Sequence, residues 1–347
     1  MPWTKRGGHL LLVRFFFIVA MFSTIHRKKN SGNYLVGLVA GKVDQRWTNV
    51  PSKTKPDACW VYTHMNKSGG STVKTLLLRH TEIEGVPHGL VKENVYTRGG
   101  SAMRKFLGQN FTVTAGGYSE GLRPFGGGVE DCKWFTMFRH PIPRLVSAYF
   151  YCRGKDDQLC GSRIVRVEDI DLRTFAKHWG NYGLRQFALS FLDQNEVLAA
   201  AEVVPEECET RCPAWYTVKL YLQRLFEENG GDSVRESSES KTEPSLAGFL
   251  EPAKALLESS YTAVGVLEEW GDSMSLFDRA LQLPNFSWTF EASRVSRKKL
   301  NEKQVKIDTL AAAWNDPELE KILWLDILLY EHAVRVHRAQ LSEYGLV

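Results

Sequence analysis

Residues 64–74 (HMNKSGGSTVK) contain the residue types best suited to binding a phosphate group. They follow an apolar run at 58–64 that is typical of a strand, and they lead into helical sequence at 73–79. Two glycines permit a tight turn, so that successive backbone N–H groups and a helix N-terminus point at one place. Such a place favours an anionic phosphate, although an ordinary glycine-rich turn between a strand and a helix has the same composition.

The position of the lysine separates this segment from the loop of nucleoside triphosphatases. In that loop, G-x-x-x-x-G-K-[ST], the lysine follows the second glycine, whereas Lys67 precedes Gly69 and Gly70. The order disfavours an ATPase or kinase of that class. A kinase or nucleotidase with an atypical phosphate loop stays an alternative.

A second group of basic and hydroxyl residues lies at 138–149 (FRHPIPRLVSAY). Arg139 ends a β-rich run, and ligands of open α/β sheets collect at the carboxyl ends of strands. Two prolines then fit the start of a helix in which Arg144, Ser147 and Tyr151 recur at three- and four-residue spacing, near one face. Arg139, with a hydroxyl from that helix, has the chemistry to bind a second phosphate.

Strands and helices alternate along the rest of the chain. Alternation of this kind is typical of an α/β fold in which helices flank a parallel sheet on both faces. Beyond the segments above, we expect strands at 111–115, 134–138 and 261–267 and helices at 270–281 and from 317 to about 341.

Composition excludes several other classes of protein. The chain has 347 residues, of which 43% are apolar and 12% aromatic, and its formal net charge is +4. Because this charge is small and unclustered, an acidic disordered chain and a nucleic-acid-coating protein are both excluded, and no nucleic-acid partner is expected. A protein with several membrane spans is excluded because only residues 10–25 are apolar enough to consider.

The N-terminal segment is expected to target or anchor the protein rather than to form part of the fold. The stretch 10–25 would rise about 24 Å as a helix, somewhat short of the hydrocarbon core of a bilayer. We expect residues 1–30 to be a membrane anchor and residues 31–56 to be a polar stem. A cleaved secretory signal and an organellar transit peptide are the alternatives. The run 227–245, rich in Glu, Ser and Gly, is expected to be a disordered insertion.

Six cysteines can pair only if the body of the protein lies in an oxidising compartment such as the secretory lumen. Cys59 and Cys132 each open a predicted strand, so they face each other if those strands are neighbours. Their spacing is not C-x-x-C, so no zinc site is expected, and buried free thiols are the alternative. One pairing of the fifteen that six cysteines allow is Cys59–Cys132, Cys152–Cys160 and Cys208–Cys212.

Three glycosylation sequons are present. Asn110 and Asn285 begin N-F-T and N-F-S. Asn66 begins a third, N-K-S, but it lies inside the predicted phosphate loop and is expected to be unused. All three matter only if the chain enters the secretory lumen.

Together, the two phosphate-binding segments resemble the cofactor-binding motifs of sulfotransferases that use 3′-phosphoadenosine 5′-phosphosulfate (PAPS). Residues 67–72 resemble the 5′-phosphosulfate loop, and residues 139–147 resemble the 3′-phosphate motif R-D-P-x-x-R-x-x-S-x-Y. The likeness is greatest to membrane-anchored carbohydrate sulfotransferases, particularly the uronyl and heparan 2-O-sulfotransferase type. It extends more loosely over 57–341, through the segments 181–187 (NYGLRQF), 261–269 (YTAVGVLEE) and 325–333 (LDILLYEHA).

The resemblance implies a fold, a reaction and a location. It implies one P-loop-like catalytic domain at 57–341, which moves the sulfuryl group of PAPS to a hydroxyl of a glycan or polysaccharide by in-line displacement, without a metal. It also implies a single-pass type II Golgi protein, held in the membrane by its N-terminal segment and with a lumenal catalytic domain. A secreted or organellar protein is the alternative for location. A non-catalytic protein that binds cofactor or glycan on the same scaffold is the alternative for function.

The resemblance further implies roles for particular residues. Lys67 would hydrogen-bond the bridging oxygen of PAPS and offset the charge on the leaving phosphate. Arg139 and Ser147 would hold the 3′-phosphate, and Arg294 matches a late basic loop that closes over it. The implied cofactor-binding set is Lys67, Ser68, Gly69, Gly70, Ser71, Thr72, Arg139, Ser147 and Arg294.

The chain departs from the family's pattern at two places. His140 replaces the usual aspartate after the arginine, which puts the capping or orienting role of that position in doubt. The family's Y-H-G-H segment, which supplies the catalytic base, corresponds to 114–122 (TAGGYSEGL), which has no histidine. Glu120 is the nearest candidate for the base, since a carboxylate serves in other sulfotransferases of this fold. His88 is its rival and His64 a more distant one.

Overall fold

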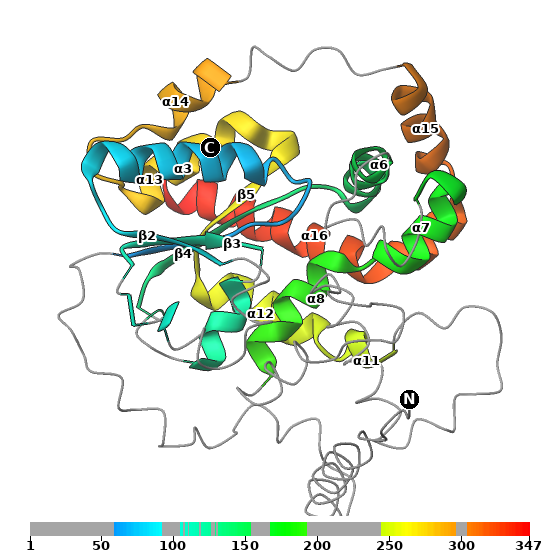
Figure 1. The fold of residues 1–347 in the computed structure, drawn as a ribbon, viewed down its shortest axis with the longest axis horizontal. Coiled ribbons are helices and arrows are strands. Elements are labelled where there is room, and N and C mark those ends of the chain that lie inside the picture. Colours follow the sequence, from blue (N-terminus) through cyan, green and yellow to red (C-terminus); the bar gives the residue numbers. More distant parts are fainter. Residues whose placement is uncertain are drawn as a thin grey trace, which may run out of the picture. The chain divides into compact units, whose positions relative to one another are not determined.

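The described part of the protein has its strands at the centre and helices on both sides of them (Figure 1). All of it belongs to the compact unit Val43–Val347. The structure is a computed structural model that describes residues 59–91, 105–106, 108–109, 111–117, 119–125, 129, 131–153, 167–192, 244–295 and 304–347.

Several expectations for flexible or membrane segments fall outside these residues. The expected anchor at 1–30, the stem at 31–56 and most of the insertion at 227–245 are among them. The last two residues of that insertion, Pro244 and Ser245, instead begin a helix. In the parts of the chain that the structure describes, no helix has the length and apolar character needed to cross a bilayer.

The described residues contain five strands, which form one sheet in which all neighbours are parallel. Tyr62 of the central strand lies beside Ala115 on one side and Phe135 on the other. The predicted α/β fold, a parallel sheet flanked by helices, is therefore confirmed. The order across the sheet is β2-β3-β1-β4-β5, with bounds β1 Trp60–Thr63, β2 His88–Val91, β3 Val113–Gly116, β4 Lys133–Phe138 and β5 Tyr261–Val266.

The strands form where apolar residues run without interruption, because a parallel sheet covered on both faces buries both sides of each strand. All four residues of β1 (WVYT) and of β3 (VTAG) are buried. Each strand expected from the sequence is present. The edge strand β2 (HGLV) was not expected, since it is short, begins with an exposed residue and contains a glycine.

Two layers of helices cover the sheet. Helices α3, α13 and α14 lie on one face, and α8 and α12 lie on the other (Figure 1). The helix bounds are α3 Gly70–Glu84, α6 Pro141–Cys152, α7 Leu172–Trp179, α8 Tyr182–Ala188, α11 Pro244–Ala247, α12 Leu250–Ser260, α13 Trp270–Leu281, α14 Trp288–Val295, α15 Gln304–Trp314 and α16 Pro317–Glu343. Short 3₁₀ helices span Ser119–Phe125, Val167–Asp169, Leu189–Phe191 and Leu267–Glu269.

The long helix α16 joins the sheet to a third cluster of helices. It begins where the sequence predicts, because Asp316 accepts a hydrogen bond from the amide of Glu318 and Pro317 occupies the first helical position. Its first half packs against α6, α7 and α15, around Leu319 and Leu323. Its second half packs on the sheet and on α12.

A disulfide joins the amino ends of two neighbouring strands. Cys59 precedes β1 and Cys132 precedes β4, and the pair is bonded as the sequence predicts. Cys152 is disulfide-bonded as well. Its predicted partner Cys160, and the predicted pair of residues 208 and 212, lie outside the described residues.

Candidate functional site

The two predicted phosphate-binding segments leave neighbouring strands at the same edge of the sheet. Lys67 follows the carboxyl end of β1, and Arg139 follows the carboxyl end of β4. From β1 the chain proceeds to β2 and β3 on one side, and from β4 it proceeds to β5 on the other. The segments therefore flank the point where the strand order reverses, which is where open α/β sheets bind ligands.

The turn between β1 and α3 brings backbone amides together. Lys67 and Gly69 both have positive φ, 64° and 74°, which is uncommon for a residue with a side chain such as Lys67. Helix α3 then begins at Gly70, earlier than the predicted start near residue 73. Gly70 has no room for a side chain, since a Cβ there would lie 2.0 Å from Cδ2 of His64.

This turn offers donors to an anion. The amides of Thr72 and Val73 both donate to the carbonyl of Gly69. The amides of Gly70 and Ser71 make no hydrogen bond to any other residue that the structure describes, as expected at a helix start. The hydroxyl of Ser68 is fully buried and also lacks a partner there. Because an unpaired buried hydroxyl is costly, it fits a ligand with acceptor oxygens.

The two segments are in direct contact. Nη1 of Arg139 donates a hydrogen bond of 3.2 Å to the backbone carbonyl of Lys67. Nζ of Lys67 lies 4.0 Å from the centre of the Tyr151 ring on α6. Ser147 precedes Tyr151 by one helical turn, so it lies on the same face of α6. The predicted residues Lys67, Arg139 and Ser147 are thus brought to one region.

Arg144 recurs with Ser147 and Tyr151 on one side of α6, as the spacing predicts, but its side chain points into the protein. Its side chain is buried and pairs with the buried carboxylate of Asp326 on α16. The carboxylate also accepts hydrogen bonds from the amides of Gly183, at 3.2 Å, and Leu184, at 2.9 Å, on α8. A buried charge needs a partner, so Arg144 turns inward to tie α6, α8 and α16 together.

Side chains of helix α8 hydrogen-bond to the turn that contains Lys67. The side-chain amide of Asn66 donates to the hydroxyl of Tyr182 on α8. Nε2 of Gln186 donates to the carbonyls of His64, at 3.4 Å, and of Gly117 in the turn after β3. The resemblance already singled out the segments 181–187 and 325–333, and these are the parts of α8 and α16 that meet here.

His140 fills the capping role that its identity put in doubt. Its Nδ1 accepts a hydrogen bond from the amide of Ile142, at 3.3 Å, at the start of α6. Its own amide donates to Glu268 beyond β5, at 3.1 Å. Burial, with the nearby charge of Arg144, lowers the pKa of His140 to about 4. The imidazole is therefore neutral near pH 7, as an acceptor in a cap must be.

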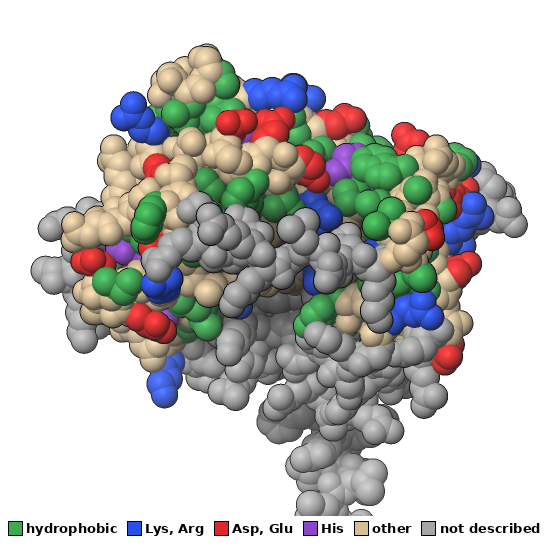
Figure 2. All heavy atoms as spheres, turned by 90° about the horizontal axis from the view of Figure 1, so that it is seen from above, with side chains coloured by type: hydrophobic (Ala, Val, Ile, Leu, Met, Phe, Trp, Pro, Cys, Tyr) green, Lys and Arg blue, Asp and Glu red, His purple; other side chains and the backbone are tan. Residues whose placement is uncertain are grey.

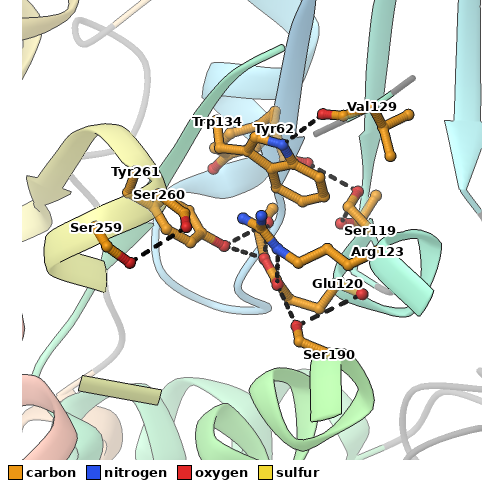
Figure 3. A network of polar contacts seen from close by, with 12 residues as sticks. Tyr62, Ser119, Glu120, Arg123, Val129, Trp134, Ser190, Ser259, Ser260 and Tyr261 are labelled. Atoms are coloured by element: carbon orange, nitrogen blue, oxygen red, sulfur yellow. Dashed lines mark hydrogen bonds and ion pairs between the residues drawn. The ribbon is translucent and has the colours of Figure 1, made fainter. Parts of the chain in front are cut away.

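Glu120 does not have the position of a general base. Its carboxylate is fully buried and accepts hydrogen bonds from Thr63, Tyr261 and Ser190, besides its ion pair with Nε of Arg123 at 2.8 Å (Figure 3). The guanidinium of Arg123 in turn lies over the ring of Trp134. A base must reach the proton that it removes, and this carboxylate is enclosed beneath the sheet.

His88 does not have that position either, because it lies at the opposite edge of the sheet. It is the first residue of β2, in register with Val113 and Trp60 at the amino ends of the neighbouring strands. Lys67 lies beyond the carboxyl ends. Four residues of strand, about 13 Å, separate the two edges.

His64 is the candidate that adjoins the loop. Its ring packs against Gly70 and lies near Tyr62, with the ring centres 6.0 Å apart. Burial, and the charges of Lys74 and Lys67, lower the pKa of His64 to about 3. Lys74 is a cation that sequence reasoning missed. The signal was available, because residue 74 is one turn after Gly70 and its side chain leans toward the helix N-terminus.

Arg294 remains untested. Position 294 lies in α14, which packs beside α3, but its side chain is outside the described residues. Among the residues that are described, no group of histidine, cysteine or acidic side chains could hold a metal ion. No protein-family model matches the chain, and no curated protein matches it either.

Proposed function

We propose that the chain is a PAPS-dependent sulfotransferase that acts on a hydroxyl group of a carbohydrate. The observation that carries this proposal is the contact between two cationic segments, in which Arg139 reaches the carbonyl of Lys67 at the reversal of strand order. A nucleotide with separate 5′ and 3′ phosphates needs two adjacent anion-binding positions. A linear triphosphate needs only one, so this pair favours PAPS over ATP.

Two separate groups of residues would bind the two phosphates of the cofactor. The amides of Gly70 and Ser71, with the hydroxyl of Ser68, would hold the 5′-phosphate at the N-terminus of α3. Arg139 and Ser147 would hold the 3′-phosphate, the planar guanidinium matching two phosphate oxygens at once.

Lys67 would act on the leaving group. Bound PAPS would supply the sulfuryl group and a phosphate that leaves. Lys67 Nζ, which lies over the Tyr151 ring, would move onto the bridging oxygen and offset the charge that develops there. Of the three sequence candidates for the base, His64 is the one that adjoins this loop.

The proposed location is the Golgi membrane, with the catalytic domain in the lumen. The Cys59–Cys132 disulfide supports an oxidising compartment. The proposed acceptor is a hydroxyl group of a glycan or polysaccharide.

A calorimetric titration of the full-length protein tests the two phosphate positions. We expect 3′,5′-ADP to bind, and ATP and 5′-AMP to bind more weakly. Lys67→Ala and Arg139→Ala should each abolish binding, whereas Lys321→Ala, an exposed residue of α16, should leave it unchanged. Equal or stronger binding of ATP would overturn the assignment of the cofactor.

A second candidate function is binding of the cofactor or a glycan without turnover. It is favoured by one observation, namely that Glu120 is enclosed and His88 lies at the wrong edge. Incorporation of sulfate from PAPS into a panel of polysaccharides separates the two functions. Transfer that survives His88→Ala and is lost in His64→Ala supports the enzyme. Tight 3′,5′-ADP binding with no transfer to any acceptor supports the binding protein.

A further inference from the structure

The structure separates the three glycosylation sequons. Asn66 lies in the Lys67 loop, where its amide bonds to the hydroxyl of Tyr182. Asn110 lies outside the described residues. Asn285 is exposed in the turn between α13 and α14, with a φ of 52°. Of Asn66 and Asn285, Asn285 is therefore the one at which an attached glycan would leave the Lys67 loop undisturbed.

The surroundings of Asn285 have room for a large substituent. Its Nδ2 donates a hydrogen bond of 3.4 Å to Glu84, at the exposed surface. Glu84 is the last residue of α3, whereas Gly70, at the phosphate site, is the first. The 15 residues of α3 span about 22 Å, so a substituent on Asn285 stays clear of the Lys67 loop.

Two large apolar side chains lie open near this turn. Ile83 is 69% exposed and Phe290 is 62% exposed. Ile83 directly precedes Glu84, which accepts the hydrogen bond from Asn285, and the ring of His80, one turn earlier on α3, lies 5.1 Å from that of Phe286, so Ile83 lies near the α13–α14 turn. Phe290 is the third residue of α14, which follows this turn. Figure 2, which views the molecule from the side of α3, α13 and α14, shows apolar side chains open among charged ones on this face.

We infer that Asn285 carries an N-linked glycan, which shields the apolar surface of Ile83 and Phe290. In the modification, Nδ2 of Asn285 forms a bond to the anomeric carbon of an oligosaccharide carried on a lipid pyrophosphate. The bond from that carbon to the pyrophosphate breaks, the lipid pyrophosphate leaves, and the amide loses one proton. A bulky, hydrated glycan covers apolar surface that would otherwise promote association. The inference rests on the lumenal location given under Proposed function.

Occupancy is tested on the full chain expressed in cells with a secretory pathway. Treatment with a peptide N-glycosidase should lower the mass of the wild-type protein, and Asn285→Gln should lack the corresponding glycan. Ser287→Thr keeps the sequon and should keep the glycan. Asn66→Gln is the matched control and should change nothing in the glycan pattern.

The Cys59–Cys132 disulfide reports whether the chain reached the lumen. A protein with this disulfide formed and no glycan on Asn285 would overturn the inference while leaving the proposed location intact. A protein with neither would overturn both. Binding of 3′,5′-ADP is measured on the same samples, so a failure of the proposed function is seen separately.

Shielding is tested by light scattering. Asn285→Gln should associate at concentrations where the wild type stays monomeric, with an unchanged midpoint of thermal unfolding. Adding Ile83→Lys and Phe290→Lys should restore the monomer, because these changes remove the apolar surface itself. If Asn285→Gln stays monomeric, the glycan does not have the shielding role.

Discussion

At the scale of single residues, the Lys67 loop depends on one position that has no side chain. A Cβ on Gly70 would approach the ring of His64 at 2.0 Å and the hydroxyl of Tyr62 at 2.9 Å. The sequence shows that a glycine is present but not which side chain makes it necessary. That neighbour is His64, a residue just six positions earlier in the chain.

Gly70→Ala should therefore distort the turn, lowering the free energy of unfolding by about 1–3 kcal/mol, as overpacking does, and weakening 3′,5′-ADP binding. His64→Ala in the same chain removes the ring that the methyl group meets and should restore much of the stability. Thermal unfolding and calorimetry of the single and double variants provide the measurement. A double variant no more stable than Gly70→Ala would show that His64 is not the obstacle.

Two partly buried histidines should make stability depend on pH. The pKa values of His64 and His140 in the fold are about 3 and about 4, below the ordinary value for histidine. Between those values and about 6.5 the unfolded chain binds more protons, so the free energy of unfolding falls as the pH is lowered through this window.

Urea unfolding between pH 7 and pH 4 should show this fall, by at most about 1.4 kcal/mol per pH unit for each histidine and by less where its side chain keeps some exposed surface, as those of His64 and His140 do. His64→Gln should flatten the dependence. Lys321→Met, on the exposed side of α16, should not. Identical pH profiles for wild type and His64→Gln would contradict the assignment.

Residue types alone located the cationic groups but not their partners. Lys67 and Arg139 were placed correctly because the ends of parallel strands share an edge. The ion pairs of Arg144 and Glu120 gave no signal, since helical spacing and proximity in sequence do not show that a charge has found a buried counter-charge. Asp326 is 182 positions from Arg144, and no local pattern joins them.

At the scale of elements, periodicity and composition predicted most of the fold. Strands β1, β3, β4 and β5 and helices α13 and α16 lie where the apolar patterns placed them. The short edge strand β2 gave no such signal, because its pairing with β3 is a tertiary effect. The start of α3 was placed late, since the glycines that open it are poor helix formers and begin the helix only because the loop fixes them.

The Arg144–Asp326 pair should matter to binding more than to stability. Arg144→Met with Asp326→Asn removes both charges together and keeps an acceptor for the α8 amides, so the free energy of unfolding should stay near that of the wild type. Binding of 3′,5′-ADP should weaken roughly tenfold, about 1.4 kcal/mol, because α8 no longer holds the loop in register with α6.

Calorimetry and urea unfolding of the same samples separate the two effects. Arg144→Met alone leaves a buried carboxylate without its partner and should cost about 3–5 kcal/mol of stability. The exposed pair Glu318–Lys321, changed to Gln and Met, is the matched control and should affect neither quantity. If Arg144→Met with Asp326→Asn binds 3′,5′-ADP as tightly as the wild type does, the proposed coupling between α6 and α8 is wrong.

At the scale of the whole molecule, the disulfide and the phosphate site occupy opposite edges of the sheet. Cys59 and Cys132 join the amino ends of β1 and β4, while Lys67 and Arg139 follow their carboxyl ends. Replacing both cysteines by serine should lower the free energy of unfolding by about 3–4 kcal/mol, since the bond closes a long loop in the unfolded chain. Below the unfolding transition, the affinity for 3′,5′-ADP should match the wild type. A large loss of affinity in folded protein would show that the two edges are coupled.

Because the chain is synthesised from its N-terminus, the strands of the sheet become available for folding at different times. Strands β1 to β4 are complete by Phe138, but β5 begins only at Tyr261, and α16, whose Gln340 bonds to the backbone of β5, comes last. At synthesis rates of about 5–20 residues per second, the four-stranded part waits many seconds for β5 and α16. Through that interval the crosslink between Cys59 and Cys132 can already hold β1 beside β4. Nascent chains stalled near residue 200 and trapped with an alkylating reagent should already contain this bond, and its absence there would mean that the sheet is assembled only after the C-terminal helix has been made.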